Sequence, residues 1–322
     1  MESVTIKAGD KLLILCSGST GNNIFCTPAI RFLRKHLRGI EIDVVALNKL
    51  SAEVFEGNPD INHLYVIDKT RKFDELAKKY TKVLCLNINA TKKLTASNTT
   101  LLLVPPFVGD VARGEQILQF VAGLIDKPVV DEDRKYVICS GVPGATNILD
   151  KFAVNTDNIL INIHMGCGRT LLHGWKFFYK DRANDVRLWP VENYVKLGNA
   201  LISRNSKIRI VITGTRNESF LAKSFEKNVP GTINLVGKTS VTELFDMMHQ
   251  LDLFVSQDCG VFHVASGTEV PMVGLFAPTS PLLAGPYPLR QQHLIIEKET
   301  MADIHVAEVV DAVFTQLENF PR

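Results

Sequence analysis

The residues with the clearest chemical potential lie in one run, residues 251–281 (LDLFVSQDCGVFHVASGTEVPMVGLFAPTSP). An apolar strand is followed by Asp258, and the turn Cys259-Gly260 leads into a helix that carries His263. A helix that begins after a strand presents unpaired backbone N–H groups and the positive end of its dipole, which suits an anion. A glycine also lets a ligand approach the backbone closely. The run therefore predicts a phosphate-binding site.

A second candidate is the Gly-rich turn GSTGNN, residues 18–23, between an apolar strand and a helix. α/β proteins place phosphates or reacting groups at such turns. The polar residues include Asn22 and Asn23 but no acid. Three interpretations stay open: a nucleotide cradle, the remains of a catalytic site, or a tight turn.

A third motif, Asp131-Glu132-Asp133, has the D-x-D spacing of metal-dependent transferases. It precedes Arg134-Lys135 and does not follow a predicted strand of a nucleotide-binding fold. We interpret it as solvated surface acids, and we expect neither a metal nor another cofactor.

Elements that could position these motifs alternate along the chain. Apolar runs predict strands, and amphipathic runs between them predict helices, which favours parallel sheets covered by helices. The predicted strands are 11–16, 42–47, 63–68, 82–88, 100–104, 158–164, 208–214, 233–237, 253–258 and 271–277. The predicted helices are 28–37, 51–57, 114–125, 191–204, 219–228, 240–251, 261–266 and 305–320.

The length of 322 residues favours two domains. The connection 125–157 has few periodic features, so we place the boundary there and predict an N-terminal domain over 1–155 and a C-terminal domain over 156–322. The last helix could close the second domain or pack back on the first.

Composition excludes several classes of protein. A net charge of +2 gives no reason to expect nucleic acid. No apolar run reaches the roughly 18 residues of a transmembrane helix, and the N-terminus lacks the features of a signal peptide. The six cysteines are scattered without a C-x-x-C pair, which is typical of buried free thiols in a cytoplasmic protein.

Residues 258–281 resemble the C-terminal signature of the lipopolysaccharide heptosyltransferase family, glycosyltransferase family 9. Two positions differ from it: Cys259 replaces a hydroxyl residue and Ala277 replaces a glycine. The segment RLWPVENYVKL resembles the family's K-x-W-P motif and the helix after it, with Arg187 at the lysine position. The resemblance implies a GT-B architecture, in which two Rossmann-like domains with parallel sheets face each other across a cleft. It also implies that the domain over 1–155 lies on the acceptor side and that the domain over 156–322 binds the nucleotide-sugar.

Two further segments, IRIVITGTRNE and NLVGKTSVTEL, resemble parts of the family that face the donor nucleotide. The resemblance implies that Arg187 contacts the diphosphate and that Glu218 accepts hydrogen bonds from the ribose. The donor-binding residues so implied are Arg187, Gly214, Glu218, Gly237, Lys238, Thr239, Asp258, Cys259, Gly260 and His263.

The segment GNNIFCTPAIRFLRKHL resembles the family's N-terminal motif, in which an Asp is taken as the catalytic base. That position is Asn22, and a carboxamide cannot accept the acceptor's proton as a carboxylate does. Asp10, Asp110 and His164 are alternatives among which the sequence gives no preference.

Two hypotheses follow from the resemblance. The first is an inverting, metal-independent glycosyltransferase that moves a heptose-like sugar from a nucleotide-diphosphate donor to a lipopolysaccharide-core or other glycan acceptor. The second is a catalytically degenerate protein that binds a sugar nucleotide. A sugar-nucleotide epimerase on the same fold and a dinucleotide-dependent oxidoreductase are weaker alternatives. The strand at 42–47 is followed by Asn48, where the oxidoreductase would need an acid.

The segment 169–187 is rich in aromatic and basic residues. It could form an acceptor lid, contact a membrane surface, or pack as a turn against the body. The partners we expect are the donor, a glycan or glycolipid acceptor and a peripheral membrane contact at the inner face.

Overall fold

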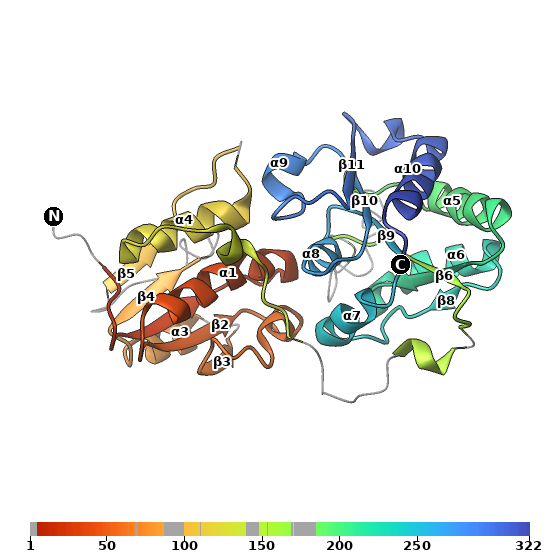
Figure 1. Ribbon diagram of the computed structural model, residues 1–322. Helices are drawn as coiled ribbons and strands as arrows, with labels where there is room; N and C mark the ends of the chain where they lie inside the picture. The colour runs from red at the N-terminus through yellow and green to blue at the C-terminus, as the bar shows by residue number, and fades with distance from the viewer. Residues whose placement is uncertain are drawn as a thin grey trace. The chain divides into compact units, whose positions relative to one another are not determined.

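The computed structural model describes residues 5–67, 70–86, 100–109, 111–139, 148–152, 154–168, 170 and 185–322. The chain divides into two compact units, Met1–Cys139 and Ser140–Arg322 (Figure 1). This division falls within the 125–157 connection. No helix in the described ranges combines the length and the apolar character needed to cross a membrane.

The first unit contains a five-stranded parallel sheet in the order β3-β2-β1-β4-β5. Its strands are β1 (Lys11–Leu15), β2 (Glu41–Ala46), β3 (His63–Val66), β4 (Lys82–Cys85) and β5 (Thr100–Leu103). Its helices are α1 (Thr20–His36), α2 (Lys49–Ala52), α3 (Thr70–Ala77) and α4 (Arg113–Ile125), with the 3-10 turns η1 (Glu53–Phe55) and η3 (Asp131–Arg134).

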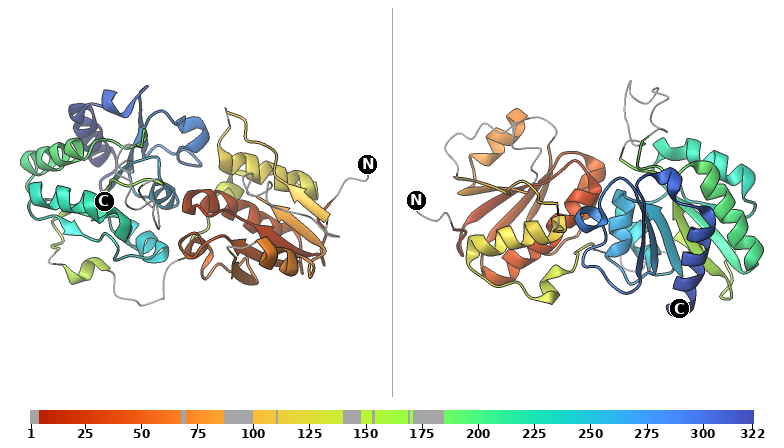
Figure 2. Two further views of the ribbon diagram at one scale, coloured as in Figure 1. Left: turned by 180° about the vertical axis from the view of Figure 1, so that it is seen from behind. Right: turned by 90° about the horizontal axis from the view of Figure 1, so that it is seen from above.

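Alternation along the strands gives this sheet two apolar faces. Leu13 and Leu15 of β1 pack with Phe73 of α3 on one face. Helices α1 and α4 pack against each other, and Figure 2 shows α3 on the opposite side of the sheet from α4. The sheet is therefore covered on both faces, as all-parallel sheets usually are.

The second unit contains a six-stranded parallel sheet in the order β11-β10-β9-β6-β7-β8. Its strands are β6 (Ile159–His164), β7 (Ile208–Thr213), β8 (Ile233–Asn234), β9 (Leu253–Gln257), β10 (Met272–Phe276) and β11 (His293–Glu297). Its helices are α5 (Val191–Arg204), α6 (Ser219–Asn228), α7 (Val241–Met248), α8 (Gly260–Ser266), α9 (Pro281–Ala284) and α10 (Val306–Asn319). Short 3-10 turns are η4 (Ile148–Lys151), η7 (Arg216–Glu218) and η8 (Met301–Asp303).

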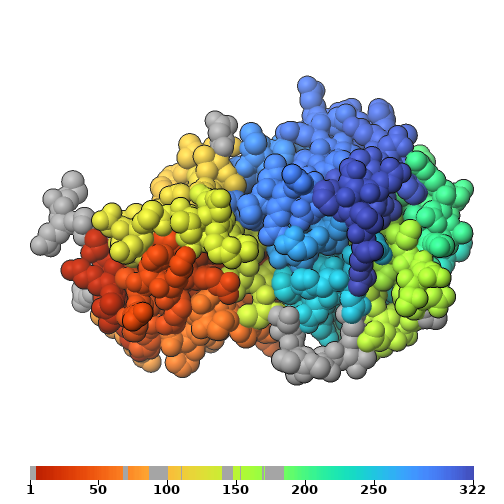
Figure 3. All heavy atoms as spheres, viewed as in Figure 1, coloured from red at the N-terminus to blue at the C-terminus, as the bar shows by residue number. Residues whose placement is uncertain are grey.

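Helices α5, α6 and α10 contribute to one core against this sheet, and α7 packs against α8. Trp189 is buried at the start of α5, where its indole N–H donates to the Ile304 carbonyl at 3.0 Å. The buried residues of α10, including Val309 and Val313, belong to the core of this second unit. Figure 3 shows α10 in dark blue on the surface of the unit.

Besides the four-residue helix α9, two elements were not predicted from the sequence. Helix α3 is short and rich in charged residues, so its apolar face consists of little more than Phe73 and its neighbours. Strand β11 ends at the first residue of the charged run Glu297-Lys298-Glu299, and its residues Leu294 and Ile295 are only half-buried. In both elements, packing against the neighbouring sheet supplies what the local pattern lacks.

Strand order reverses between β1 and β4 in the first unit and between β6 and β9 in the second. Ligands of open parallel sheets bind outside the carboxyl ends of the strands at such switch points. The GSTGNN turn follows β1, and the turn Asp258-Cys259 follows β9. The fold thus places both sequence motifs at switch points.

His293, the first residue of β11, should make stability depend on pH. Its ring is buried, and Nδ1 accepts a hydrogen bond from the Arg290 N–H at 3.2 Å. Burial, helped by the Arg290 charge, lowers the pKa of His293 from 6.5 to about 4. Between these values the unfolded chain binds a proton that the folded chain does not, so stability rises with pH through this window and falls as pH drops towards 4.

We expect His293→Gln to remove about 3 kcal/mol of this pH-dependent change in unfolding free energy. Urea unfolding at several pH values between 4 and 7 measures it. The exposed Gln291 provides the control, because Gln291→Ala removes no titratable group and should leave the slope unchanged. An unchanged slope in His293→Gln would contradict the assignment.

Candidate functional site

The carboxyl ends of β6, β7 and β9 lie side by side because the three strands are adjacent and parallel. Within the ladders His164 pairs with Thr213 on one side and Ser256 on the other. Four charged or titratable side chains lie near this edge: Arg187, Glu218, Asp258 and His263. We call these four residues the strand-end cluster.

Arg187 is held by the buried carboxylate of Asp185. Its Nε and Nη2 lie 3.2 Å from the two Asp185 oxygens, and its backbone N–H also donates to Oδ1 at 3.0 Å. Its Nη1 lies 3.6 Å from Asp258 Oδ2. Burial alone would lower the pKa of the guanidinium, but hydrogen bonds to Asp185 outweigh it and raise the pKa above its usual value. Arg187 is therefore a fixed cation whose Nη1 faces the β9–α8 turn.

Asp258 and His263 flank the start of α8. Asp258 Oδ1 lies 4.0 Å from His263 Nε2, and the Asp258 side chain keeps 13% of its surface exposed. The His263 ring is buried and packs edge-on against Phe262, with 5.7 Å between ring centroids. The structure thus brings Arg187, Asp258 and His263 together, as the sequence predicts.

Cys259 caps α8 in place of a hydroxyl residue. Its Sγ accepts from the Phe262 N–H at 3.4 Å and lies 3.2 Å from Ser256 Oγ. Burial raises the pKa of this thiol to about 12. The thiol is therefore a neutral cap near pH 7. Gly260 is the first residue of α8, which is seven residues long. The anion site expected at this helix start stays a prediction.

Glu218 is buried, with both carboxylate oxygens already bonded. Oε2 accepts from the Thr215 N–H at 2.7 Å, and Oε1 accepts from the Thr170 hydroxyl at 2.5 Å. Gly214, at the end of β7, lies against the same carboxylate. A ribose hydroxyl would have to share these oxygens or displace Thr170.

The segment Gly237-Lys238-Thr239 follows β8 at the edge of the sheet. Gly237 has φ +72°, donates to the Gly214 carbonyl at 2.7 Å, and leaves no room for a Cβ beside Arg216. Lys238 is exposed and donates to the Asn234 carbonyl at 2.7 Å. Gly237 is thus joined to the β7 end through Gly214, and Lys238 is turned towards β8.

Sequence reasoning missed the loop after β6. A Cβ on Gly166 would lie 1.6 Å from Glu218 Oε1, so only glycine fits there. The Gly166 carbonyl accepts from Gln257 Nε2 at 2.7 Å, and the Tyr194 hydroxyl donates to Gln257 Oε1. The signal was present in the sequence, because HMGCG is a glycine-containing turn directly after a strand. Asp185 was also missed as the partner of Arg187.

We expect Gly166→Ala to displace Glu218 and lower the unfolding free energy by about 2–4 kcal/mol, because the overlap breaks buried hydrogen bonds. Gly168→Ala is the matched control. A Cβ there would meet Arg187 Nη2 at an ordinary 3.6 Å. Chemical denaturation of both variants measures the difference. Equal stability of the two would show that the loop yields easily around Glu218.

In the first unit, Asn22 lies in the first turn of α1 and is half-buried. Its carbonyl accepts from Cys26 Sγ at 3.2 Å. The neighbouring Asn23 is fully buried and fixes the turn: Oδ1 accepts from the Ser17 N–H, and Nδ2 donates to the Ser17 and Ser51 carbonyls. Asn22 itself is not required for this network.

Of the three alternative bases, Asp10 precedes β1 and therefore lies at the opposite sheet edge from Asn22. It also pairs with Lys82 at 2.5 Å. His164 is buried and 3.2 Å from the Thr213 hydroxyl, and burial lowers its pKa. Asp110, together with residues 169 and 171–184 of the aromatic segment, lies outside the described residues.

The D-x-D motif is only half solvated. Asp131 is fully exposed, but Asp133 is buried, pairs with Lys35 at 2.6 Å and accepts from the Val130 N–H. The prediction of solvated acids was therefore right for Asp131 and wrong for Asp133, which caps η3 and ties it to α1.

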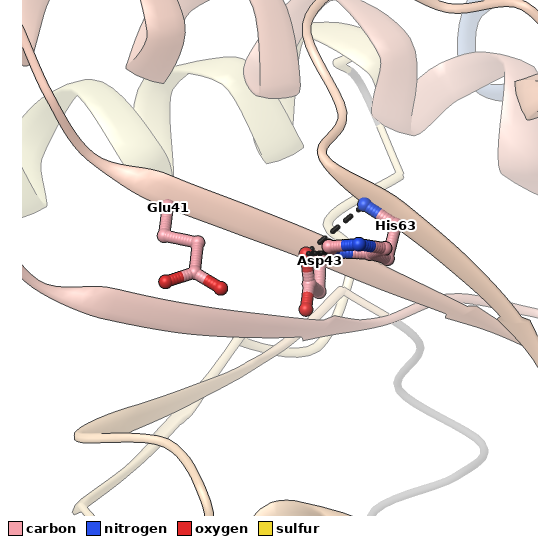
Figure 4. A group of neighbouring side chains, drawn as sticks. All are labelled: Glu41, Asp43 and His63. Carbon is pink, nitrogen blue, oxygen red and sulfur yellow. Dashed lines mark hydrogen bonds and ion pairs between the residues drawn. The ribbon is translucent and has the colours of Figure 1, made fainter.

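Glu41, Asp43 and His63 could in principle hold a metal, since one ligand atom of each lies within 4.8 Å of the others (Figure 4). Lys11 already pairs with Glu41 at 2.8 Å. Asp43 is buried and accepts from Tyr80 and His63. The group lies where β2 and β3 begin, at the opposite sheet edge from the GSTGNN turn, so it is a satisfied polar network.

Residues 178–313 match the sequence model of glycosyltransferase family 9 (heptosyltransferase). The chain is 27% identical to lipooligosaccharide heptosyltransferase 2 of Haemophilus influenzae over 106 residues. That alignment covers 31% of this chain and 30% of the relative, so it spans less than a third of the relative's length.

Similar solved structures extend over the whole chain. A glycosyl transferase family 9 protein from Veillonella parvula gives a TM-score of 0.77 at 18% identity, covering 98% of this chain and 100% of that one. The E. coli heptosyltransferase WaaC with ADP gives 0.67 at 16% identity, covering 95% and 99%. At these identities the likeness is one of fold. The fold is that of GT-B glycosyltransferases, built from two Rossmann-like units.

Proposed function

Because the chain carries a glycosyltransferase family 9 domain over residues 178–313, we propose that it is an inverting, metal-independent glycosyltransferase. It takes a heptose-like sugar from a nucleotide-diphosphate donor and delivers it to a lipopolysaccharide-core or other glycan acceptor. The observation that carries the proposal is Arg187, which the buried Asp185 fixes beside Asp258 and His263 where the central strands end.

Donor binding rests on this cation. Arg187 Nη1 is 3.6 Å from Asp258, longer than a normal hydrogen bond, so a phosphate could replace that contact and leave the Asp185 contacts in place. As the glycosidic bond breaks, charge grows on the departing diphosphate, and a fixed guanidinium stabilises it without a metal. The presence of ADP in the WaaC structure supports a nucleoside diphosphate as the ligand class.

The acceptor and sugar are proposed from relatives. The curated similar proteins are named as heptosyltransferases of lipooligosaccharide or lipopolysaccharide core. We assign the acceptor to the first unit, at the edge formed by the turn after β1. A membrane-linked acceptor would also bring this unit to a membrane surface.

Asn22 favours a second candidate function. If no other base acts, the chain binds the sugar nucleotide without efficient transfer. A transfer assay separates the two: purified chain is incubated with nucleotide-sugars and glycan acceptors, with EDTA present, and released nucleoside diphosphate is measured. Acceptor-dependent release supports the transferase. Donor binding without release supports the degenerate binder, and neither binding nor release would contradict both.

We expect Arg187→Ala to weaken nucleoside diphosphate binding by about 1.5–3 kcal/mol, the range for hydrogen bonds to charged groups. Binding of the nucleoside alone should change little, since Arg187 is assigned to the phosphates. Calorimetric titration of both ligands measures this. An equal loss for the two ligands would point to general disruption and remove Arg187 from the diphosphate site.

Asn22→Asp restores a carboxylate with nearly the same shape. A positioned base typically contributes about 10²–10⁴-fold, so a slow wild-type transfer rate should rise measurably. Donor affinity should stay near the wild-type value because the base acts on the acceptor. The comparison uses single-donor, single-acceptor rates. A fast wild type that Asn22→Asp slows would show that the proton leaves through another residue.

A further inference from the structure

His164 is the last residue of β6, the strand in the middle of the three strand ends. It pairs with Thr213 of β7 on one side and Ser256 of β9 on the other. The residue keeps 4% of its surface exposed, and its Nδ1 lies 3.2 Å from the Thr213 hydroxyl oxygen. Its Nε2 forms no hydrogen bond with a residue in the described part of the chain. Since buried polar groups normally have partners and ligands bind at strand ends, this nitrogen points to a ligand.

The hydrogen bonds behind the ring fix which nitrogen carries the proton. The Thr213 hydroxyl donates to Oδ1 of the fully buried Asn162 at 3.1 Å. A hydroxyl has one proton to donate, so the Thr213 oxygen accepts from His164 Nδ1. Burial lowers the pKa of His164, against smaller opposing contributions from the Glu218 charge and a Thr213 backbone hydrogen bond. The ring is therefore neutral near pH 7, and its Nε2 is a hydrogen-bond acceptor.

The other acceptor in this part of the site, Glu218, is already engaged. Its Oε1 accepts from Thr170 and its Oε2 from Thr215. Gly166, two residues beyond His164, lies against Oε1 of the same carboxylate. A hydroxyl that enters here therefore meets occupied oxygens at Glu218 and an unoccupied nitrogen at His164.

The cation assigned to the diphosphate lies on the same loop. Arg187 Nη2 is 4.0 Å from the sulfur of Cys167, which is three residues beyond His164. In a nucleoside diphosphate the ribose is the group that carries the phosphates, so it binds closer to Arg187 than the nucleobase does. The position of His164 therefore suits a ribose hydroxyl.

We propose that His164 Nε2 accepts a hydrogen bond from a ribose hydroxyl of the donor nucleotide and so selects ribonucleotides. The inference deepens the proposed function and rests on its nucleoside diphosphate site. It assigns the recognition of the ribose to the end of β6, and it leaves Glu218 to hold the loop after β6 against the end of β7.

The test is calorimetric titration of the whole chain with ADP and with dideoxy-ADP, whose ribose lacks both hydroxyls. Wild type should bind ADP about three- to tenfold more tightly, the value of one hydrogen bond between neutral partners. His164→Asn keeps an amide near the Nδ1 position for Thr213 but places nothing at Nε2, so it should bind the two nucleotides equally. Its affinity for dideoxy-ADP should match that of wild type, which a merely structural role of His164 would not allow.

His164→Gln places an amide oxygen near the Nε2 position and should keep part of the preference for ADP. His249→Asn is the matched control, because His249 is exposed at the end of α7 and should leave the full preference in place. Equal affinity of wild type for the two nucleotides would overturn the proposal. A preference that survives in His164→Asn would overturn it too and would assign the ribose to Glu218. Absence of any ADP binding would contradict the donor site of the proposed function itself, and this inference with it.

Discussion

The geometry of the strand-end cluster depends on one buried carboxylate. Glu218 is almost fully shielded from water, so its carboxylate oxygens must form hydrogen bonds inside the protein. It meets this need by bonding to Thr170 and Thr215 and by lying where any side chain on Gly166 would be. The loop after β6 is thereby pressed against the end of β7. Gln257 of β9 donates a hydrogen bond to the same loop, so the ends of β6, β7 and β9 are connected to one another.

On this surface, the charged groups around Arg187 are held at fixed distances from one another. The guanidinium faces two carboxylates that differ in kind: Asp185 is buried and bonded twice at 3.2 Å, while Asp258 is partly exposed and 3.6 Å away. The closer contact fixes the orientation of Arg187, and the longer one is the weaker of the two. An anionic ligand would therefore compete with Asp258 and leave the Asp185 contact intact. The cation needs no rearrangement to receive charge, which is the condition under which electrostatic stabilisation is largest.

Whether a feature of the fold or the site could be predicted from the sequence depends on how far apart along the chain the interacting residues lie. Strand ends and switch points were predictable, because in a parallel α/β sheet every apolar run ends at the same edge. Thus Asp258, His263 and Gly214 were placed correctly near that edge. The Glu218–Thr170 bond joins residues 48 apart, and Tyr194–Gln257 joins residues 63 apart. Contacts of this range depend on side-chain packing between elements, and no local pattern encodes them. The same reasoning explains Asp133, whose partner Lys35 lies 98 residues away.

The two adjacent asparagines of the first unit differ in how much the fold depends on their side chains. Asn23 is fully buried, and its three hydrogen bonds hold Ser17 and Ser51 around the start of α1. Asn22 shares the turn, yet its side chain forms no hydrogen bond within the described residues, and only its carbonyl is engaged by Cys26. A change at position 22 therefore leaves the turn and the helix intact, whereas a change at position 23 would leave buried backbone groups unpaired. A carboxamide or a carboxylate at position 22 is therefore equally compatible with the fold. The turn and the helix thus do not depend on which side chain stands at position 22. The catalytic base is whichever group can accept the proton of the acceptor hydroxyl.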